Sequence, residues 1–458
     1  MKRLLITALG LLGIMSSALA DTNWYQPYLD SMGQNLGRAK PAVDCNKPLA
    51  FAGGINFDYR SGNRYEGYMG ENTERYSLND AYLDAFGRVN SMVNAFVELS
   101  YNNTSIAEKL TGSAGANGIN PNRLDGQYSN VYPGTANGQS GISNIIGLQQ
   151  AYITLGDLNR SPFFVQLGRQ FEDYGRYQIH AMTRTFTQVL TETLRTSANL
   201  GFVIPCGLHG QVFLFDTPEV SASVTGSVEA ISFINQETHS GYTYGASLGF
   251  DQFCDQLGYG VNLSYLSNMV SVNDISFAVL NQANQFTPTR FYAHAVGAIA
   301  LNGHINTGPF SFILNYTTAL QNFNPFDLRS QASSDPSPIG NVNSLLSGIG
   351  AKPWALDATA NYAFNAWFKD QNVYLGYQTG GDLALIPLPS SRWLVGYNID
   401  LMKTCNYGIN LGLEWTHDIA YSASKTRDAL AVSVDPSFAQ YVSGNSDTLG
   451  FRAAVKFG

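Results

Sequence analysis

The feature of this sequence that most constrains its fold is the repeated alternation of apolar and polar residues. Successive side chains on a β-strand point to opposite faces, so each alternating segment predicts a strand with one apolar and one polar face. In 257–268, for example, tyrosine, valine and leucine alternate with glycine, asparagine and serine. The same pattern predicts sixteen strands, at 49–59, 78–89, 91–101, 147–157, 162–171, 196–204, 208–216, 241–251, 257–268, 291–302, 308–320, 353–366, 371–380, 391–402, 406–418 and 446–457.

The connections between these segments alternate between short and long. Short connections are expected at Asn90, Leu158–Ser161, Pro205–Leu208, Gln252–Gln256, Gly303–Thr307, Ala366–Asp370 and Lys403–Cys405. Long ones are expected at 60–77, 102–146, 172–195, 217–240, 269–290, 321–352, 381–390 and 419–445. An even strand count with this asymmetry predicts an all-β antiparallel transmembrane barrel with short periplasmic turns and long extracellular loops. The segment 222–234 would add a hairpin, so eighteen strands is the alternative.

Composition agrees with a barrel that has one face in lipid. Charged residues make up 13% of the chain, against about 25% in typical soluble domains. Aromatic residues reach 12%, and the mean hydropathy is only -0.10. A barrel accounts for this mixture because one residue in two along each strand faces lipid. The formal net charge of -8 argues against nucleic acid as a partner.

The N-terminal residues predict export from the cytoplasm. A basic start is followed by an apolar run and then by the small-residue pattern Ala18-Leu19-Ala20. These are the parts of a cleaved secretory signal peptide, which we place at residues 1–20. Residues 21–48 would then form a short periplasmic segment, and residues 49–458 the barrel.

The last ten residues predict the membrane into which the barrel inserts. In 449–458 the apolar residues alternate with Arg452 and Lys456, and an aromatic residue, Phe457, stands next to the end. The stretch resembles the closing strand of bacterial outer-membrane barrels. We therefore expect a bacterial outer-membrane location, with outer-membrane lipid and lipopolysaccharide as surroundings.

The four cysteines are predicted to form disulfide bonds at the periplasmic rim of the barrel. Cys206, Cys254 and Cys405 fall in short connections, and Cys45 precedes the first strand. The periplasm is oxidising, and an even set of cysteines favours pairing, although four cysteines allow three connectivities. Because neighbouring turns lie close together in a closed barrel, Cys45–Cys405 and Cys206–Cys254 are the favoured bonds.

No catalytic or cofactor-binding pattern stands out in the sequence. The chain has no HExxH and no glycine loop for a phosphate or a dinucleotide. Its six histidines are scattered rather than grouped with a nucleophile. We therefore expect no enzymatic activity, no cofactor and no metal site.

The stretch 166–202 is rich in arginine and is the candidate for a pore constriction. A long connection between two strands can fold into the lumen, where arginines bind anionic solutes in bidentate fashion. The alternative is a solvated outer loop whose charges only keep it soluble. The candidate constriction residues are Arg169, Arg176, His180, Arg184 and Arg195.

Charged residues on the polar register of the strands should face the lumen. They indicate a wet interior, although a closed network of salt bridges would fill it instead. The predicted lumen-facing charges are Asp58, Arg88, Glu98, Asp357, Arg392, Asp400, Arg452 and Lys456.

Part of the arginine-rich stretch resembles a known family. The runs GRQF (168–171), YGRY (174–177) and FTQVLTE (186–192), preceded by QAYITLGDL (150–158), are similar to the LbtU-type siderophore porins. In that family a strand ending in G-K/R-Q leads into a phenylalanine–glycine turn, where this chain has Tyr174-Gly175, and then into a T-Q-x-L-x-E run. The resemblance implies a sixteen-stranded outer-membrane porin that takes part in ferric siderophore uptake.

Three functions are consistent with the sequence. The first is a porin or receptor-like channel for a small anionic solute, with a ferric siderophore as the solute that the resemblance implies. The second is a general diffusion porin, and the third is a structural or adhesive barrel that acts through its long loops. A monomer or a homotrimer would suit each of them.

Overall fold

The computed structural model describes most of the predicted barrel. It covers residues 49–62, 75–103, 144–176, 181–216, 242–252, 257–272, 295–322, 352–383, 388–404, 407–421 and 445–458. The strands in these ranges are β1 (Leu49–Gly62), β2 (Arg75–Asn90), β3 (Val93–Asn103), β4 (Asn144–Leu155), β5 (Phe163–Phe171), β6 (Leu194–Val203), β7 (Leu208–Asp216), β8 (Tyr242–Gln252), β9 (Leu257–Leu266), β10 (Ala298–Thr307), β11 (Phe310–Ala319), β12 (Trp354–Ala366), β13 (Lys369–Gly381), β14 (Ser391–Lys403), β15 (Tyr407–Ile419) and β16 (Ser446–Phe457).

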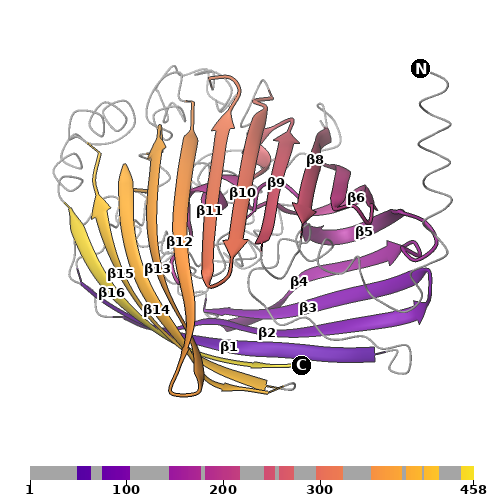
Figure 1. Ribbon diagram of the computed structural model, residues 1–458. Coiled ribbons are helices and arrows are strands. Elements are labelled where there is room, and N and C mark those ends of the chain that lie inside the picture. The colour runs from indigo at the N-terminus through magenta and orange to yellow at the C-terminus, as the bar shows by residue number, and fades with distance from the viewer. Residues whose placement is uncertain are drawn as a thin grey trace.

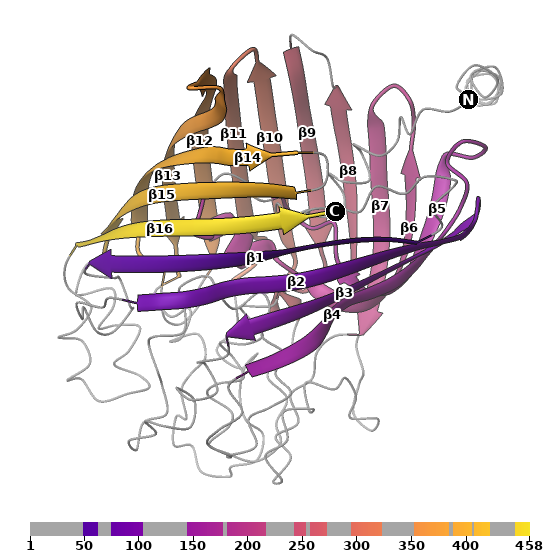
Figure 2. The same cartoon turned by 90° about the horizontal axis from the view of Figure 1, so that it is seen from below.

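The strands form one closed antiparallel barrel (Figures 1 and 2). Each strand pairs with its neighbours in sequence, and β16 pairs with β1 to complete the ring. Closure leaves no edge with unpaired backbone groups. The sixteen-stranded prediction is confirmed. The eighteen-stranded alternative is wrong, because β7 pairs directly with β8 and no strand from 222–234 lies between them.

The outer face of the wall is apolar and the inner face is polar, which is the reverse of the arrangement in a water-soluble protein. On β9, Val261 and Leu263 point outward and are half-exposed, whereas Asn262 and Ser264 point inward and are buried. The same alternation runs through most of the ring. Burial therefore falls on polar side chains and exposure on apolar ones, which is the pattern of a barrel in lipid. Among the described residues no helix has the length and hydropathy needed to cross a membrane.

One predicted turn was wrong. A connection was expected at Gly303–Thr307, but β10 continues through these residues to Thr307, and the chain reverses at Gly308 and Pro309. Gly308 has a φ of 53°, which glycine adopts without steric cost. The apolar alternation is interrupted in this part of β10 by Asn302, Gly303, His304 and Asn306. An interruption of this kind in the sequence is typical of a turn.

Several predictions concern residues outside the described ranges. They include the signal peptide, the segment 21–48, His180 and three of the cysteines (Cys45, Cys254 and Cys405). Cys206 is described, and it lies in the short turn between β6 and β7 as expected. Its thiol is free and exposed, so the predicted Cys206–Cys254 bond is not formed in this structure.

The seam between the two ends of the barrel depends on a small residue. Gly53 of β1 lies opposite Phe457 of β16. A Cβ atom at position 53 would lie 2.6 Å from the ring of Phe457 and 2.7 Å from the carbonyl oxygen of Tyr82. The absence of a side chain at Gly53 lets the terminal aromatic ring lie across the joint.

We expect Gly53→Val to weaken barrel closure. The added side chain overpacks the seam, and overpacking typically costs about 1–3 kcal/mol. Gly87→Val is a matched control, because Gly87 also lies on the outer face and nothing lies within 4 Å of a Cβ there. The readout is the temperature at which the folded form disappears in semi-native gel electrophoresis. Equal transition temperatures for the two variants would contradict the importance of this seam.

Candidate functional site

The described parts of the connection between β5 and β6, residues 172–176 and 181–193, lie inside the ring of strands, and we call them the inner segment (Figure 2). It contains the helix α4 (Phe186–Thr191), all of whose residues are buried. Thr185 caps this helix by accepting a hydrogen bond from the backbone N–H of Gln188 at 3.2 Å. The helix packs against β11, β12 and β13, on the wall opposite β5.

The first part of the inner segment is attached to β8 and β9. The hydroxyl of Ser247 on β8 donates to the carboxylate of Asp173. The backbone N–H of Gly175 donates to Ser264 Oγ on β9 at 3.0 Å. Gly175 has a φ of 81°, and a Cβ there would lie 2.5 Å from the Thr191 hydroxyl, so a side chain cannot fit at this position.

Arg176 ends this first attachment in a buried cluster on β7 and β8. Its Nη1 lies 3.1 Å from Asp251 Oδ2, and its Nη2 lies 2.8 Å from His209 Nε2. Because arginine only donates hydrogen bonds, His209 accepts at Nε2 and carries its proton on Nδ1. That Nδ1–H donates to the carbonyl oxygen of Gly207 at 3.1 Å. The contacts therefore assign the neutral form to His209.

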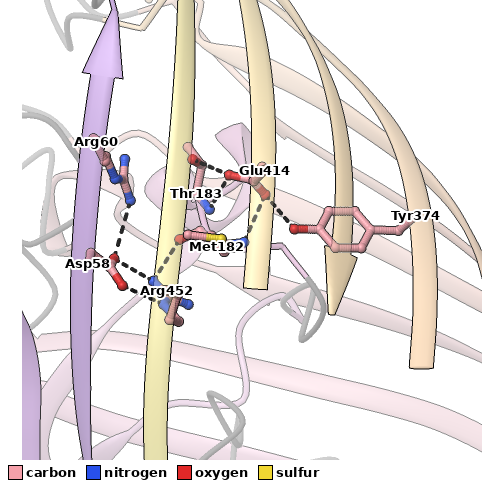
Figure 3. Close-up of polar contacts among 7 residues, drawn as sticks. All are labelled: Asp58, Arg60, Met182, Thr183, Tyr374, Glu414 and Arg452. Carbon is pink, nitrogen blue, oxygen red and sulfur yellow. Dashed lines mark hydrogen bonds and ion pairs between the residues drawn. The ribbon is translucent and has the colours of Figure 1, made fainter. Parts of the chain in front are cut away.

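The second attachment is made by Glu414 on β15 (Figure 3). Its carboxylate accepts hydrogen bonds from the backbone N–H groups of Met182 at 2.8 Å and Thr183 at 3.0 Å. It also accepts from the Thr183 hydroxyl at 2.6 Å and from the Tyr374 hydroxyl at 2.8 Å. One carboxylate thus holds two consecutive backbone amides of the inner segment against the wall.

A bidentate ion pair across the seam supports this second attachment. Arg452 of β16 donates from Nε and Nη2 to the two carboxylate oxygens of Asp58 on β1, at 2.7 and 2.8 Å. The same Nη2 lies 3.1 Å from the carbonyl oxygen of Met182. Arg60 approaches Asp58 at 3.7 Å from the other side (Figure 3). The seam and the inner segment therefore share one network.

Helix α4 is held by a third carboxylate. Asp357 of β12 accepts from both the backbone N–H and the hydroxyl of Thr187 in the first turn of the helix. Within the segment, Arg184 and Gln188 each donate to Glu192, at 3.0 Å in both cases. A negative group at a helix N-terminus is stabilising, so Asp357 orients the helix as well as attaching it.

Arg392 of β14 extends the network along the wall. It donates to both oxygens of Asp418, at 2.5 and 3.1 Å. It also lies 3.4 Å from the carbonyl oxygen of Arg184 and over the ring of Phe186, 5.3 Å from its centroid. The inner segment therefore contacts the wall through β14 as well.

The two attachments lie on nearly opposite sides of the barrel. Six strands separate β8 from β15 in one direction and eight in the other. The inner segment is therefore fixed to the wall at two well-separated places.

The predicted constriction residues do not share one location. Arg176 and Arg184 belong to the inner segment. Arg195 is the second residue of β6, lies on its inner face and donates to the carbonyl oxygens of Leu194 and Ser271. Arg169 pairs in register with Ala151 and Thr196 on the outer face, so the structure does not place it in the lumen.

The predicted lumen-facing charges lie at two levels. Asp58, Asp357, Arg392 and Arg452 belong to the network around the inner segment, whereas Glu98 on β3 accepts a hydrogen bond from Gln150 Nε2 on β4 at 2.6 Å. The three acids among these five residues are at most 2% exposed. Arg88, Asp400 and Lys456 lie toward the short-turn ends of their strands and are half-buried.

Sequence reasoning missed two anchoring acids. Asp251 and Glu414 stand on the polar register of clearly alternating strands, and that register was the available signal. With Asp357, they are the wall carboxylates that accept from the inner segment at β8, β12 and β15. Asp251 is fully buried and Glu414 is 2% exposed, so the inner segment covers both carboxylates.

The base of the inner segment contains a carboxyl group that resists ionisation. Burial raises the pKa of Glu172 from 4.5 to about 8, even though Asn199 donates to it at 2.9 Å. Burial also raises the pKa of the neighbouring Asp173, from 3.8 to about 6. Near neutral pH Glu172 is therefore largely protonated.

Comparisons with known proteins give distant relatives and a shared fold. No family model matches the chain. A UPF0422 protein of Coxiella burnetii is 26% identical over 307 residues, which are 66% of this chain and 57% of the relative. A UPF0422 protein of Legionella pneumophila (strain Philadelphia 1) is 20% identical over 434 residues, 92% of this chain and 66% of the relative. The chain thus spans about 57–66% of the length of these two relatives.

Solved structures with a similar backbone share little sequence with the chain. OprB of Pseudomonas putida has a TM-score of 0.50 at 11% identity and covers 90% of this chain and 95% of its own. The outer membrane channel DcaP of Acinetobacter baumannii has a TM-score of 0.47 at 10% identity, over 91% of this chain and 100% of its own. The likeness to OprB concerns the barrel fold.

We expect Glu414→Gln to release the inner segment from β15. An amide has one acceptor oxygen in place of two and turns an NH2 group toward the other donor, so at least one of the backbone N–H groups of Met182 and Thr183 loses its partner, at a cost of about 1–3 kcal/mol. Hydrogen exchange of that amide should accelerate roughly ten- to hundredfold. Tyr374→Phe is the control, because it removes one hydrogen bond from Glu414 and leaves both amides bound. Unchanged exchange in Glu414→Gln would disprove the attachment.

We expect the stability of the barrel to fall as the pH rises from 4.5 to about 8. The folded-state pKa of Glu172 is above its ordinary value of 4.5. Its stabilising contribution is therefore complete below pH 4.5 and is lost as the pH approaches about 8. The slope is at most about 1.4 kcal/mol per pH unit from this group. Thermal unfolding at several pH values should show a flatter dependence for Glu172→Gln, and an identical dependence would exclude Glu172 as the cause.

Proposed function

We propose that this protein is a channel of the bacterial outer membrane through which small anionic solutes pass beside the inner segment. The proposal rests first on the reversed polarity of the wall. A ring of half-exposed leucine, valine and aromatic side chains is stable against lipid, and buried polar side chains on the inner face suit a path for polar solutes. The closed backbone satisfies the hydrogen-bonding requirement of a membrane span.

The choice of an anionic solute rests on which partner of each ion pair is more exposed to the lumen. Asp58 is 1% exposed, whereas its partners Arg60 and Arg452 are 13% and 19% exposed. Asp251 is fully buried, and its partner Arg176 is 15% exposed. In each pair the carboxylate lies behind the guanidinium, so the surface that a solute meets is the cationic one. This order favours anions even though the pairs are neutral overall.

An inner segment that is attached to several strands favours a selective channel over a general diffusion porin. Helix α4 packs against β11–β13 inside the ring, and other described parts of the segment are attached to β9 and β15. Solutes with several carboxylates fit the bidentate geometry that arginines offer. Among these, a ferric carboxylate siderophore is the candidate supported by the sequence resemblance. Ferric citrate is a suitable probe, and it should reduce the current carried by chloride.

We expect the reconstituted protein to conduct in planar bilayers with a preference for anions. Arg176→Ala combined with Arg184→Ala should lower that preference, since one charge at about 4 Å contributes about 1 kcal/mol in water. The loss is roughly fivefold in the anion-to-cation permeability ratio for each charge at low salt.

Two matched variants control this measurement. Lysine at both positions keeps the charges and should keep the preference. Arg160→Ala removes an arginine that is 80% exposed in a short turn, and it should change nothing. Absence of any current in the wild-type protein would refute the channel, and an unchanged ratio in the double alanine variant would refute the role of these arginines.

A further inference from the structure

The turn between β12 and β13 consists of two exposed aromatic residues. Trp367 and Phe368 have φ values of 54° and 59°, and their side chains are 80% and 98% exposed. The two-residue loop joins Ala366 directly to Lys369 in register. Figure 1 shows this hairpin at the end of the barrel that carries the short turns. The pore described above makes no use of these residues.

The backbone of this turn does not favour aromatic residues. Two-residue turns with both central residues at positive φ usually contain Asn-Gly or Asp-Gly, because bulky residues are sterically disfavoured there. Trp367 and Phe368 are too exposed for packing within the described residues to explain them. An outlier of this kind at a protruding position points to an external binding role.

The end of β14 extends the exposed apolar surface. A bulge in β14 follows Asp400, and the adjacent Leu401 and Met402 are 39% and 43% exposed. Lys369 Nζ donates to the carbonyl oxygen of Leu401 at 2.5 Å, which fixes the two strand ends together. We call Trp367, Phe368, Leu401 and Met402, with the flanking Lys369 and Lys403, the tip patch.

The tip patch continues the outer face of the barrel. The ring of Phe364 lies 5.6 Å from that of Tyr362, which lies 5.0 Å from that of Phe310. These rings stand at the short-turn rim, where aromatic girdles mark the membrane interface. The aromatic row therefore leads from the lipid-facing wall to the turn without a polar break on this face of β12.

The distance of the tip from this row identifies the layer that it reaches. Beyond Phe364, the last ring of this row, β12 continues through Asn365 and Ala366, two residues or about 7 Å. At a strand tilt of about 40° this is about 5 Å along the membrane normal. The headgroup layer on each side of a bilayer is of similar depth, about 5–8 Å. The tip thus reaches the headgroups rather than the hydrocarbon.

We propose that the tip patch binds the phospholipid headgroups of the periplasmic leaflet and anchors this side of the barrel. Indole rings favour the membrane interface. The ammonium groups of Lys369 and Lys403 are placed to meet phosphate while their alkyl stems lie along apolar surface. Lys403 is 68% exposed and its partner Asp370 is 59% exposed, so this ion pair yields readily to an anionic headgroup. The proposal rests on the membrane location proposed above.

Fluorescence quenching tests the position of Trp367. The full chain is reconstituted in vesicles of phosphatidylethanolamine and phosphatidylglycerol, and the difference between wild type and Trp367→Phe isolates the emission of Trp367. Lipid brominated near the headgroup end of its acyl chains should quench this emission at least twofold more than iodide does. Quenching by iodide alone would place the tip in water and overturn the proposal in favour of a protein partner or a second copy.

A second variant separates lipid binding from folding. Trp367→Asn with Phe368→Gly supplies the residues that this turn favours, so the barrel should fold in detergent at least as well as the wild type. In vesicles, added phosphatidylglycerol should raise the unfolding temperature of the wild type more than that of this variant. An equal rise in both would overturn the proposal.

Measurement of the current across a bilayer separates the lipid-binding proposal from the channel proposal. The turn variant should conduct like the wild type, because the tip lies outside the lumen. Lipid quenching of Trp367 in a barrel that carries no current would refute the channel and support the anchor.

Discussion

The structure depends on the closure of its hydrogen-bonded ring. A wall that faces lipid has no water to satisfy backbone N–H and C=O groups, so every strand must pair on both sides. The pairing of β1 with β16 meets this requirement, and Gly53 makes the joint possible because it leaves room for Phe457. Closure also creates an interior that can hold charged side chains. The same side chains would be unfavourable on the outer face, which meets lipid.

The inner segment lies inside this ring and is held there by a small number of carboxylates. Wall carboxylates on β8, β12 and β15 hold it, and they act as acceptors for backbone amides and arginines rather than as free charges. Buried carboxylates are tolerated only when they are paired or protonated. Asp251 and Glu414 follow the first route and Glu172 the second. In the ion pairs Arg176–Asp251 and Arg452–Asp58, the arginine is the more exposed partner.

Much of the fold could be predicted because its pattern is local. Period-two alternation and turn residues are read within one strand, and fifteen of the predicted segments lie close to observed strands. The exception at β10 arose where Gly303 and His304 interrupt the alternation. The candidate site was harder: Arg176 and Arg184 were found as arginines in a long connection, but Arg169 faces outward. The face on which Arg169 lies depends on the register of β5, and the number of charges in the neighbouring connection does not reveal that register.

By itself, the sequence determined the class of the molecule: which faces are apolar, how many strands there are, and which end of the barrel has short turns. These properties follow from the order of residues along each strand. The tertiary structure decided the partners. Asp251 meets Arg176, and Glu414 meets Met182, across 75 and 232 positions of chain. Such pairs depend on the curvature of the barrel and on where the inner segment is attached to the wall, and these are properties of the whole ring.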